Sequence, residues 1–127
     1  MRGTGLTAGP SLACRAAASG EAYTIPFTGE SDFVYVDDVA AAFEAAASPG
    51  FDGAQVHNVT GELAAAADVA AILNRLVPGA RIDAAGPALP VAARIDEGEL
   101  RQVFPSVPRT ALADGIAHTL HYYSERR

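Results

Sequence analysis

The most informative part of the sequence is Gly29-Glu30-Ser31-Asp32-Phe33-Val34-Tyr35-Val36-Asp37-Asp38-Val39-Ala40. Residues 33–36 are apolar or aromatic, a pattern that predicts a strand. Asp37 and Asp38 follow at once, and we interpret them as an N-cap and a first-turn carboxylate that satisfy free amides and complement the helix dipole. We therefore expect a strand that leads directly into a helix over residues 39–47, with Val39 and Phe43 on one face and a stop at residues 48–50.

On the N-terminal side of this stretch, the sequence predicts one helix and one extended segment. A helical run begins after Thr7 and tolerates Pro10 in its first turn, and Gly20 is placed as its C-terminal stop. Residues 23–27 then form an extended segment, followed by a turn around Gly29 and Glu30.

On the C-terminal side, apolar spacing predicts three more helices. The clearest helix has Val69, Ile72, Leu73 and Leu76 on one face and stops at Pro78-Gly79. Residues 96–103 predict a second helix, and a third begins at Thr110. Short strands are expected at 55–59 and 81–83, and residues 84–93 predict a loop. The order α-β-β-α-β-α-β-α-α has too few strands for an independent doubly wound sheet, so we expect an α/β fragment in which a helical layer carries two or three small strand pairs.

Composition limits the possible partners and locations. The 127 residues make one domain at most, and half are hydrophobic, but many of these are alanine, so the expected core is thin. Nine arginines, no lysine and fifteen acidic residues give a net charge of −6, which disfavours nucleic acid and anionic membranes. Cys14 is the only cysteine, so no intramolecular disulfide is possible. No apolar run reaches the ~18 residues of a membrane span, and we expect a cytoplasmic protein.

Several short motifs occur in an order that resembles the C-terminal half of the extended short-chain dehydrogenases/reductases, the NAD-dependent epimerase/dehydratase family. No single motif is specific, but together they cover nearly the whole sequence. They are Arg2-Gly3-Thr4-Gly5-Leu6-Thr7, Ile25-Pro26-Phe27, the stretch from Asp32 to Ala40, Asn58-Val59-Thr60-Gly61, Val77-Pro78-Gly79-Ala80, and Thr110-Ala111-Leu112-Ala113-Asp114-Gly115-Ile116.

The resemblance implies that residues 1–127 are the substrate-binding part of such an enzyme and do not include its N-terminal dinucleotide-binding domain. The family's glycine-rich fingerprint has no match here, and its Tyr-x-x-x-Lys pair cannot exist without lysine. We therefore expect no catalytic, cofactor-binding or metal-binding residue in this chain, and NAD or NADP only in the intact enzyme. Such a sequence can arise from a truncated gene, from a start assigned too late, or from a split enzyme.

The resemblance also implies a set of substrate-binding residues. Nucleotide-sugar epimerases carry an arginine just before the Asp-Phe of the motif that corresponds to Asp32-Phe33, and this chain has Ser31 at that position. A small sugar, a sugar acid or another hydroxy-carbonyl compound therefore fits better than a nucleoside-diphosphate sugar. The alternatives are an N-cap role for Thr7, strand packing for Ile25 and Phe27, and a solvated side chain for Arg94. The residues implied are Thr7, Ile25, Phe27, Ser31, Tyr35 and Arg94.

Two functional hypotheses follow. In the first, the chain is the substrate-side part of an NAD(P)-dependent epimerase, dehydratase or dehydrogenase and works with a separate N-terminal half or a homodimer partner. In the second, it is a stand-alone, non-enzymatic binding or interaction module derived from that family. His118 and His121 are spaced so that both could bind one metal ion. We favour the alternative that they are ordinary surface histidines, because no third ligand is evident.

Overall fold

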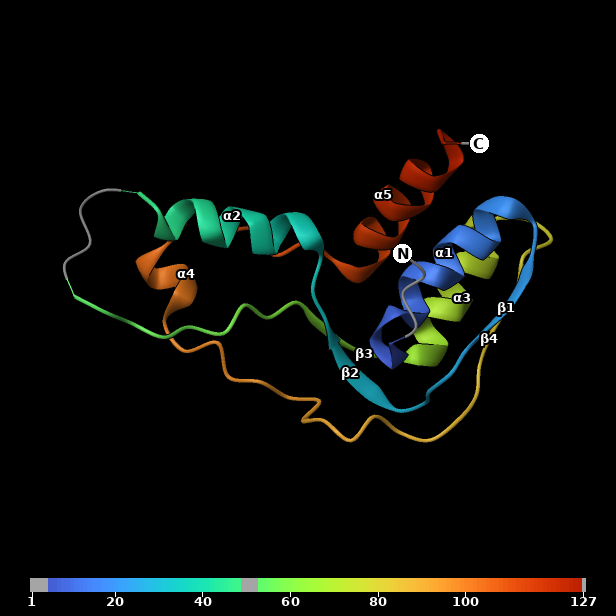
Figure 1. The fold of residues 1–127 in the computed structure, drawn as a ribbon, viewed down its shortest axis with the longest axis horizontal. Coiled ribbons are helices and arrows are strands. Elements are labelled where there is room, and N and C mark those ends of the chain that lie inside the picture. The colour runs from blue at the N-terminus through green and yellow to red at the C-terminus, as the bar shows by residue number, and fades with distance from the viewer. Residues whose placement is uncertain (1–4, 49–52, 127) are drawn as a thin grey trace.

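Two strand pairs and five α-helices make up the computed structural model, which describes residues 5–48 and 53–126 (Figure 1). The motif residues Arg2, Gly3 and Thr4 and the helix stop at Pro49 and Gly50 lie outside the described residues. The elements are the 3-10 turn Leu6–Ala8, α1 (Gly9–Ser19), β1 (Ala22–Ile25), β2 (Glu30–Phe33), α2 (Val36–Ala46), β3 (Glu62–Ala65), α3 (Ala66–Leu76), β4 (Arg81–Ala84), α4 (Leu100–Val103) and α5 (Leu112–Ser124). Their order is the one predicted.

The main lobe consists of α1, α3 and α5 with the parallel pair β1–β4 (Figure 1). Ala22 lies opposite Arg81, and Ile25 lies opposite Ala84. The core of this lobe contains Ile25, Phe27, Val69, Leu73, Ile82 and Ile116 together with several alanines. Alanines are six of the fifteen buried apolar residues among those described, so the core is as thin as the composition predicts.

Glycine and asparagine fix the ends of elements in the main lobe. Gly20 has a φ of 71°, and the amides of Gly20 and Glu21 donate to the carbonyls of Ala17 and Ala16, which closes α1 as predicted. The side-chain amide of Asn74 donates to the carbonyl of Ile82 at 2.8 Å and accepts from its N–H at 3.0 Å. It thereby satisfies backbone groups of β4 that the strand pair leaves free.

The second lobe consists of α2, α4, residues 54–61 and residues 96–109, and it extends to one side of the main lobe (Figure 1). Its small core contains Ala42, Leu100 and Val107, with Val59 and Phe104 partly buried against it. The antiparallel pair β2–β3 joins the two lobes, with Glu30 opposite Ala65 and Phe33 opposite Glu62. The amide of Gly61 donates to the Asp32 carboxylate at 3.0 Å, which ties the end of residues 54–61 to β2.

Three predicted elements need correction. The strand expected at 33–36 is β2, three residues earlier, because Val36 already begins α2. Residues 55–59 form no strand; the strand lies at β3 instead, and Val56 is 96% exposed with no strand beside it among the described residues. The helix expected over 96–103 is only the single turn α4, since residues 96–99 form a loop in which Gly98 has a φ of 60°.

Helix starts also differ from the prediction. Ala8, not Thr7, is the N-cap of α1, and it makes no side-chain capping bond. Tyr35 is the N-cap of α2, so Asp37 and Asp38 both lie in the first turn and neither caps the helix. Phe43 does not share a buried face with Val39 but is 75% exposed. The inward position is taken by Asp38, whose carboxylate accepts from the Thr110 amide at 2.7 Å and from its hydroxyl at 2.6 Å.

Candidate functional site

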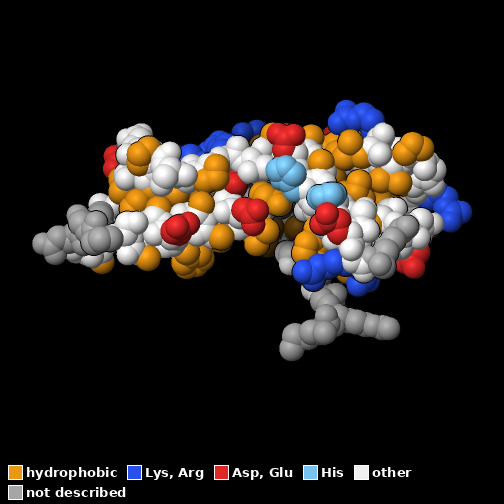
Figure 2. Space-filling model, turned by 90° about the horizontal axis from the view of Figure 1, so that it is seen from above, with side chains coloured by type: hydrophobic (Ala, Val, Ile, Leu, Met, Phe, Trp, Pro, Cys, Tyr) orange, Lys and Arg blue, Asp and Glu red, His pale blue; other side chains and the backbone are white. Residues whose placement is uncertain are grey.

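A pocket lies where the main lobe meets the start of α2, and the surface is visibly hollowed between the lobes (Figure 2). Its volume is about 100 Å³. The first turns of α1 form one wall, the link from β2 to α2 forms a second, and the start of α5 forms a third. The lining residues are Pro10, Ser11, Cys14, Phe33, Val34, Tyr35, Thr110, Ala111, Leu112, Gly115, Ile116 and Thr119.

The lining carries no charge near neutral pH. Burial raises the pKa of the Cys14 thiol to about 11. The pKa of Tyr35 is raised by burial first, then by the charge of Asp37 and a hydrogen bond to it, and by the charge of Asp38. The other lining side chains are aliphatic, aromatic or hydroxyl groups. The pocket therefore suits a small uncharged group that has an apolar part.

Close packing at Gly115 sets the position of Tyr35. A Cβ on Gly115 would lie 3.2 Å from the Tyr35 ring, so only glycine lets the ring approach α5 this closely without a shift. The Tyr35 ring also contacts the His118 ring, with 5.6 Å between the centroids. The hydroxyl of Thr119 donates to the Gly115 carbonyl at 2.7 Å. One turn of α5 thus holds the aromatic wall of the pocket.

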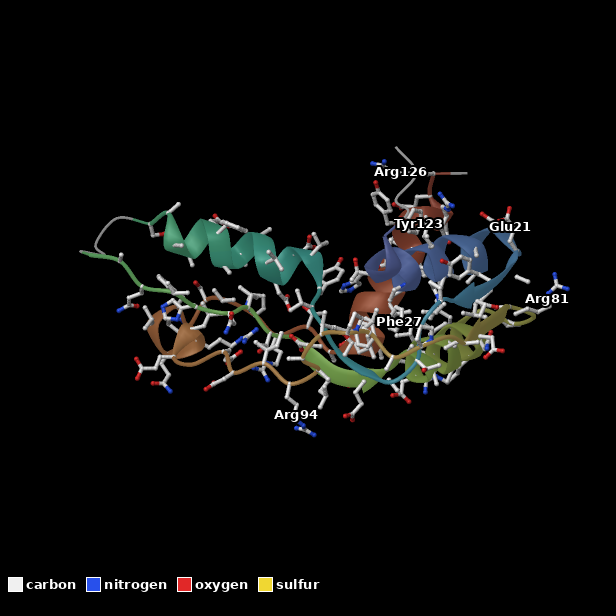
Figure 3. All side chains as sticks on the ribbon, turned by 60° about the horizontal axis from the view of Figure 1, so that its bottom comes forward. Glu21, Phe27, Arg81, Arg94, Tyr123 and Arg126 are labelled. Atoms are coloured by element: carbon white, nitrogen blue, oxygen red, sulfur yellow. The ribbon has the colours of Figure 1, made fainter. Side chains whose placement is uncertain are left out.

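Of the six substrate-binding residues implied by the resemblance, the structure brings only Tyr35 to the pocket. Ile25 and Phe27 lie in the main-lobe core, where Phe27 points inward among packed side chains (Figure 3). Ser31 is a half-buried strand residue opposite Ala64. Thr7 is exposed in the 3-10 turn, and Arg94 projects from the surface (Figure 3).

Most of the pocket was missed by sequence reasoning. Gly115 lies inside the motif that begins at Thr110, and that motif was the one available signal for the α5 wall. Cys14 is buried, with 2% of its surface exposed, and nothing in its spacing placed it beside Tyr35.

A polar cluster holds residues 54–61 to the α4 region in the second lobe. Glu97 accepts from the Thr60 hydroxyl at 2.6 Å and from Arg109 at 2.6 Å, and it also pairs with Arg101. Arg101 in turn donates to the carbonyls of Thr60 at 3.1 Å and Pro108 at 2.8 Å. The pKa of Glu97 is lowered by the Thr60 hydrogen bond first, and then by Arg109 and Arg101 against an opposing effect of burial.

This lowered pKa makes part of the stability dependent on pH. Because Glu97 binds its proton less readily when folded, it contributes stability above the unfolded pKa of about 4.3, and that contribution is lost as the pH falls through the folded pKa. We expect Glu97→Gln to flatten the dependence of the unfolding free energy on pH between about 5 and 3, by at most about 1 kcal/mol. Urea unfolding across this range measures it. Thr60→Val, which keeps both arginines, should give an intermediate slope, and equal slopes for Glu97→Gln and the wild type would contradict the assignment.

No group of three or more His, Cys, Asp or Glu side chains among the described residues is arranged to hold a metal ion. His118 contacts Tyr35, and His121 lies 3.2 Å from Glu125. In residues 5–48 and 53–126, no helix is long and apolar enough to cross a membrane.

Comparison with solved structures finds a similar fold in a UDP-glucuronic acid 4-epimerase from Bacillus cereus, determined in complex with NAD. The match has a TM-score of 0.67 and 18% sequence identity, and it covers 93% of this chain but 39% of the epimerase. The chain therefore has the fold of about two fifths of that protein. No family model matches the sequence. No curated protein matches it either.

Proposed function

We propose that this chain is the substrate-side part of an NAD(P)-dependent epimerase, dehydratase or dehydrogenase of the extended short-chain family. The observation that carries the proposal is the fold, which follows part of the UDP-glucuronic acid 4-epimerase over 93% of the chain. The ordered motifs from Ile25 to Ile116 support the same assignment. In this proposal, residues 1–127 supply walls of a substrate site and leave proton and hydride transfer to another part of the enzyme.

The described residues do not fit a dinucleotide. The pocket of about 100 Å³ is small beside the roughly 300–1,000 Å³ of ordinary ligand sites. The link from β2 to α2, residues 34–35, contains no glycine that would let a backbone approach a pyrophosphate, and α3 follows β3 with no residue between them. NAD or NADP would therefore be held by a separate N-terminal half.

The proposed substrate is a small sugar or another hydroxy-carbonyl compound. The uncharged lining around Tyr35 supports an uncharged portion of the substrate at that point. Ser31, where related nucleotide-sugar enzymes carry arginine, supports a substrate without a diphosphate. Of the residues implied by the resemblance, Tyr35 lines this pocket and would contact the substrate there.

We expect the isolated chain to bind a neutral hydroxy-carbonyl compound and to reject a matched anion. Titration with hydroxyacetone should shift the amide resonances of Ser11, Gly115 and Thr119 in a saturable way, whereas pyruvate, of similar size, should not shift them. Thr119→Leu fills the pocket and should abolish the shifts, and Glu21→Gln, on the distant surface shown in Figure 3, should not. Equal binding of pyruvate would contradict the neutral-pocket assignment.

A stand-alone binding module is the second candidate, and the pocket itself favours it because three separate segments of this one chain form its walls. Reading the coding frame upstream of the Met1 codon, and its neighbouring genes, separates the two. The enzyme proposal expects a polypeptide with the glycine fingerprint and Tyr-x-x-x-Lys. Conversion of a small sugar to a product, followed by NMR of the sugar, should then occur only when both parts and NAD(P) are mixed. Ligand binding without any gain in activity on mixing would favour the module.

A further inference from the structure

Helix α2 is apolar on almost every side. Its eleven residues include only three charged ones, Asp37, Asp38 and Glu44. Asp38 and Ala42 face inward and are buried, whereas Val36 and Phe43 on the opposite face are 69% and 75% exposed, with exposed Ala40 between them. Helices that are apolar all round are normally covered on both faces. Figure 2 looks onto this side of the molecule and shows apolar side chains along the second lobe.

The exposed stripe, Val36, Ala40 and Phe43, cannot be covered by rotating α2. The helix is fixed by the Asp38 carboxylate, which accepts two hydrogen bonds from Thr110, and by Ala42 packed in the core with Leu100 and Val107. Turning Phe43 inward would bring the buried carboxylate into solvent and leave the Thr110 donors unpaired. The stripe is therefore a fixed outer surface of the folded chain.

The charged residues beside the stripe are acidic and lie along one edge of it. At 100° per residue, Asp37 and Glu44 fall on the same edge of the helix, next to the stripe, and residues 36–46 contain no cation. The other edge, at Val39 and Ala46, is apolar. We propose that this stripe docks into an apolar groove of a different polypeptide, which carries Arg or Lys along one edge to meet Asp37 and Glu44.

Charge complementarity favours a different polypeptide over a second copy. An antiparallel pair of α2 helices related by a two-fold axis would bring the two acidic edges onto the same side, so that Asp37 of one copy faces Glu44 of the other. Like charges placed opposite each other weaken such an interface. In a parallel two-fold pair, the acidic edge of each copy would lie against the apolar edge at Val39 and Ala46 of the other, where the carboxylates meet no cation. The inference uses only α2, and it stands whether or not the partner carries the NAD(P) chemistry.

The test places a photo-crosslinking amino acid at position 43 in the native cell. The matched control places it at Tyr122, an aromatic residue that is 47% exposed on α5. We expect a heterologous adduct from position 43 and none of the same species from position 122. The captured polypeptide is then purified and mixed with the chain, and complex formation is followed by fluorescence anisotropy at increasing salt concentrations.

In the purified complex, Phe43→Ser should weaken binding at least about tenfold, which corresponds to about 1.4 kcal/mol. Asp37→Asn with Glu44→Gln should weaken binding at low salt and flatten its salt dependence. Since these side chains are exposed, the circular dichroism spectrum of each variant should match that of the wild type. An adduct between two copies, no adduct at position 43, or a partner indifferent to Phe43→Ser would each overturn the inference. A partner without the glycine fingerprint would support docking while contradicting the split-enzyme proposal.

Discussion

Replacement of Asp38 by alanine is expected to lower the free energy of unfolding by about 3 kcal/mol. Asp38 is 1% exposed, and its two carboxylate oxygens accept from the amide and the hydroxyl of Thr110. Alanine would leave both donors without their partner at the contact between α2 and the segment before α5. Urea unfolding followed by circular dichroism measures the loss.

Asp37→Ala is the matched control, because it removes a carboxylate from the same helix turn and so has the same effect on the helix dipole. Asp37 is exposed, and its removal should change stability by less than about 1 kcal/mol. Asp38→Asn, which keeps one acceptor oxygen, should lie between the two. If Asp38→Ala were no worse than Asp37→Ala, the Thr110 contacts would contribute nothing measurable.

Gly61→Ala is expected to be the most damaging conservative substitution, with a loss of about 4 kcal/mol or more. A Cβ on Gly61 would lie 1.8 Å from the carbonyl oxygen of Phe33 and 2.8 Å from the Cα of Val34. Both are backbone atoms, so no side-chain rotation can relieve the collision. Moving residue 61 away from β2 would also break the hydrogen bond from the Gly61 amide to the Asp32 carboxylate. Denaturant midpoints, or failure to fold, report the effect.

Gly79→Ala separates steric collision from backbone strain. Gly79 has a φ of 84°, and no heavy atom lies within 4 Å of the Cβ that alanine would add. This substitution should therefore lower the free energy of unfolding by about 1 kcal/mol, which is the cost of placing alanine in a left-handed conformation. A Gly61→Ala protein as stable as Gly79→Ala would show that β2 and residue 61 do not approach as closely as described.

The order of elements could be predicted because helix periodicity and turn residues are local signals. The stripe of Val69, Ile72, Leu73 and Leu76 and the stop at Gly20 depend only on neighbouring residues, and both predicted helices are confirmed. The strand expected at 55–59 is wrong because a strand also requires a partner, and none lies beside this segment in the described chain. The inward position of Asp38 depends on Thr110, 72 residues away, which no local pattern reveals.

The site was less predictable than the fold for the same reason. Three separate stretches, around Cys14, Tyr35 and Gly115, meet at the pocket, and only tertiary packing brings them together. The substrate-binding residues implied by the family resemblance come from several separate segments. Of these residues, Tyr35 reaches the pocket, at the point where β2 leads into α2.

The two lobes are interlaced along the chain. It leaves the main lobe after β2, passes through α2 and residues 54–61, returns through β3, α3 and β4, leaves again for α4 and returns at α5. Neither lobe is a continuous segment, so no single cut can release one of them intact. During synthesis, β1 can pair only after β4 has been made, because the paired residues Ala22 of β1 and Arg81 of β4 are far apart in sequence. Such non-local closure slows folding, and the nascent chain carries an unpaired β1 until β4 has been made.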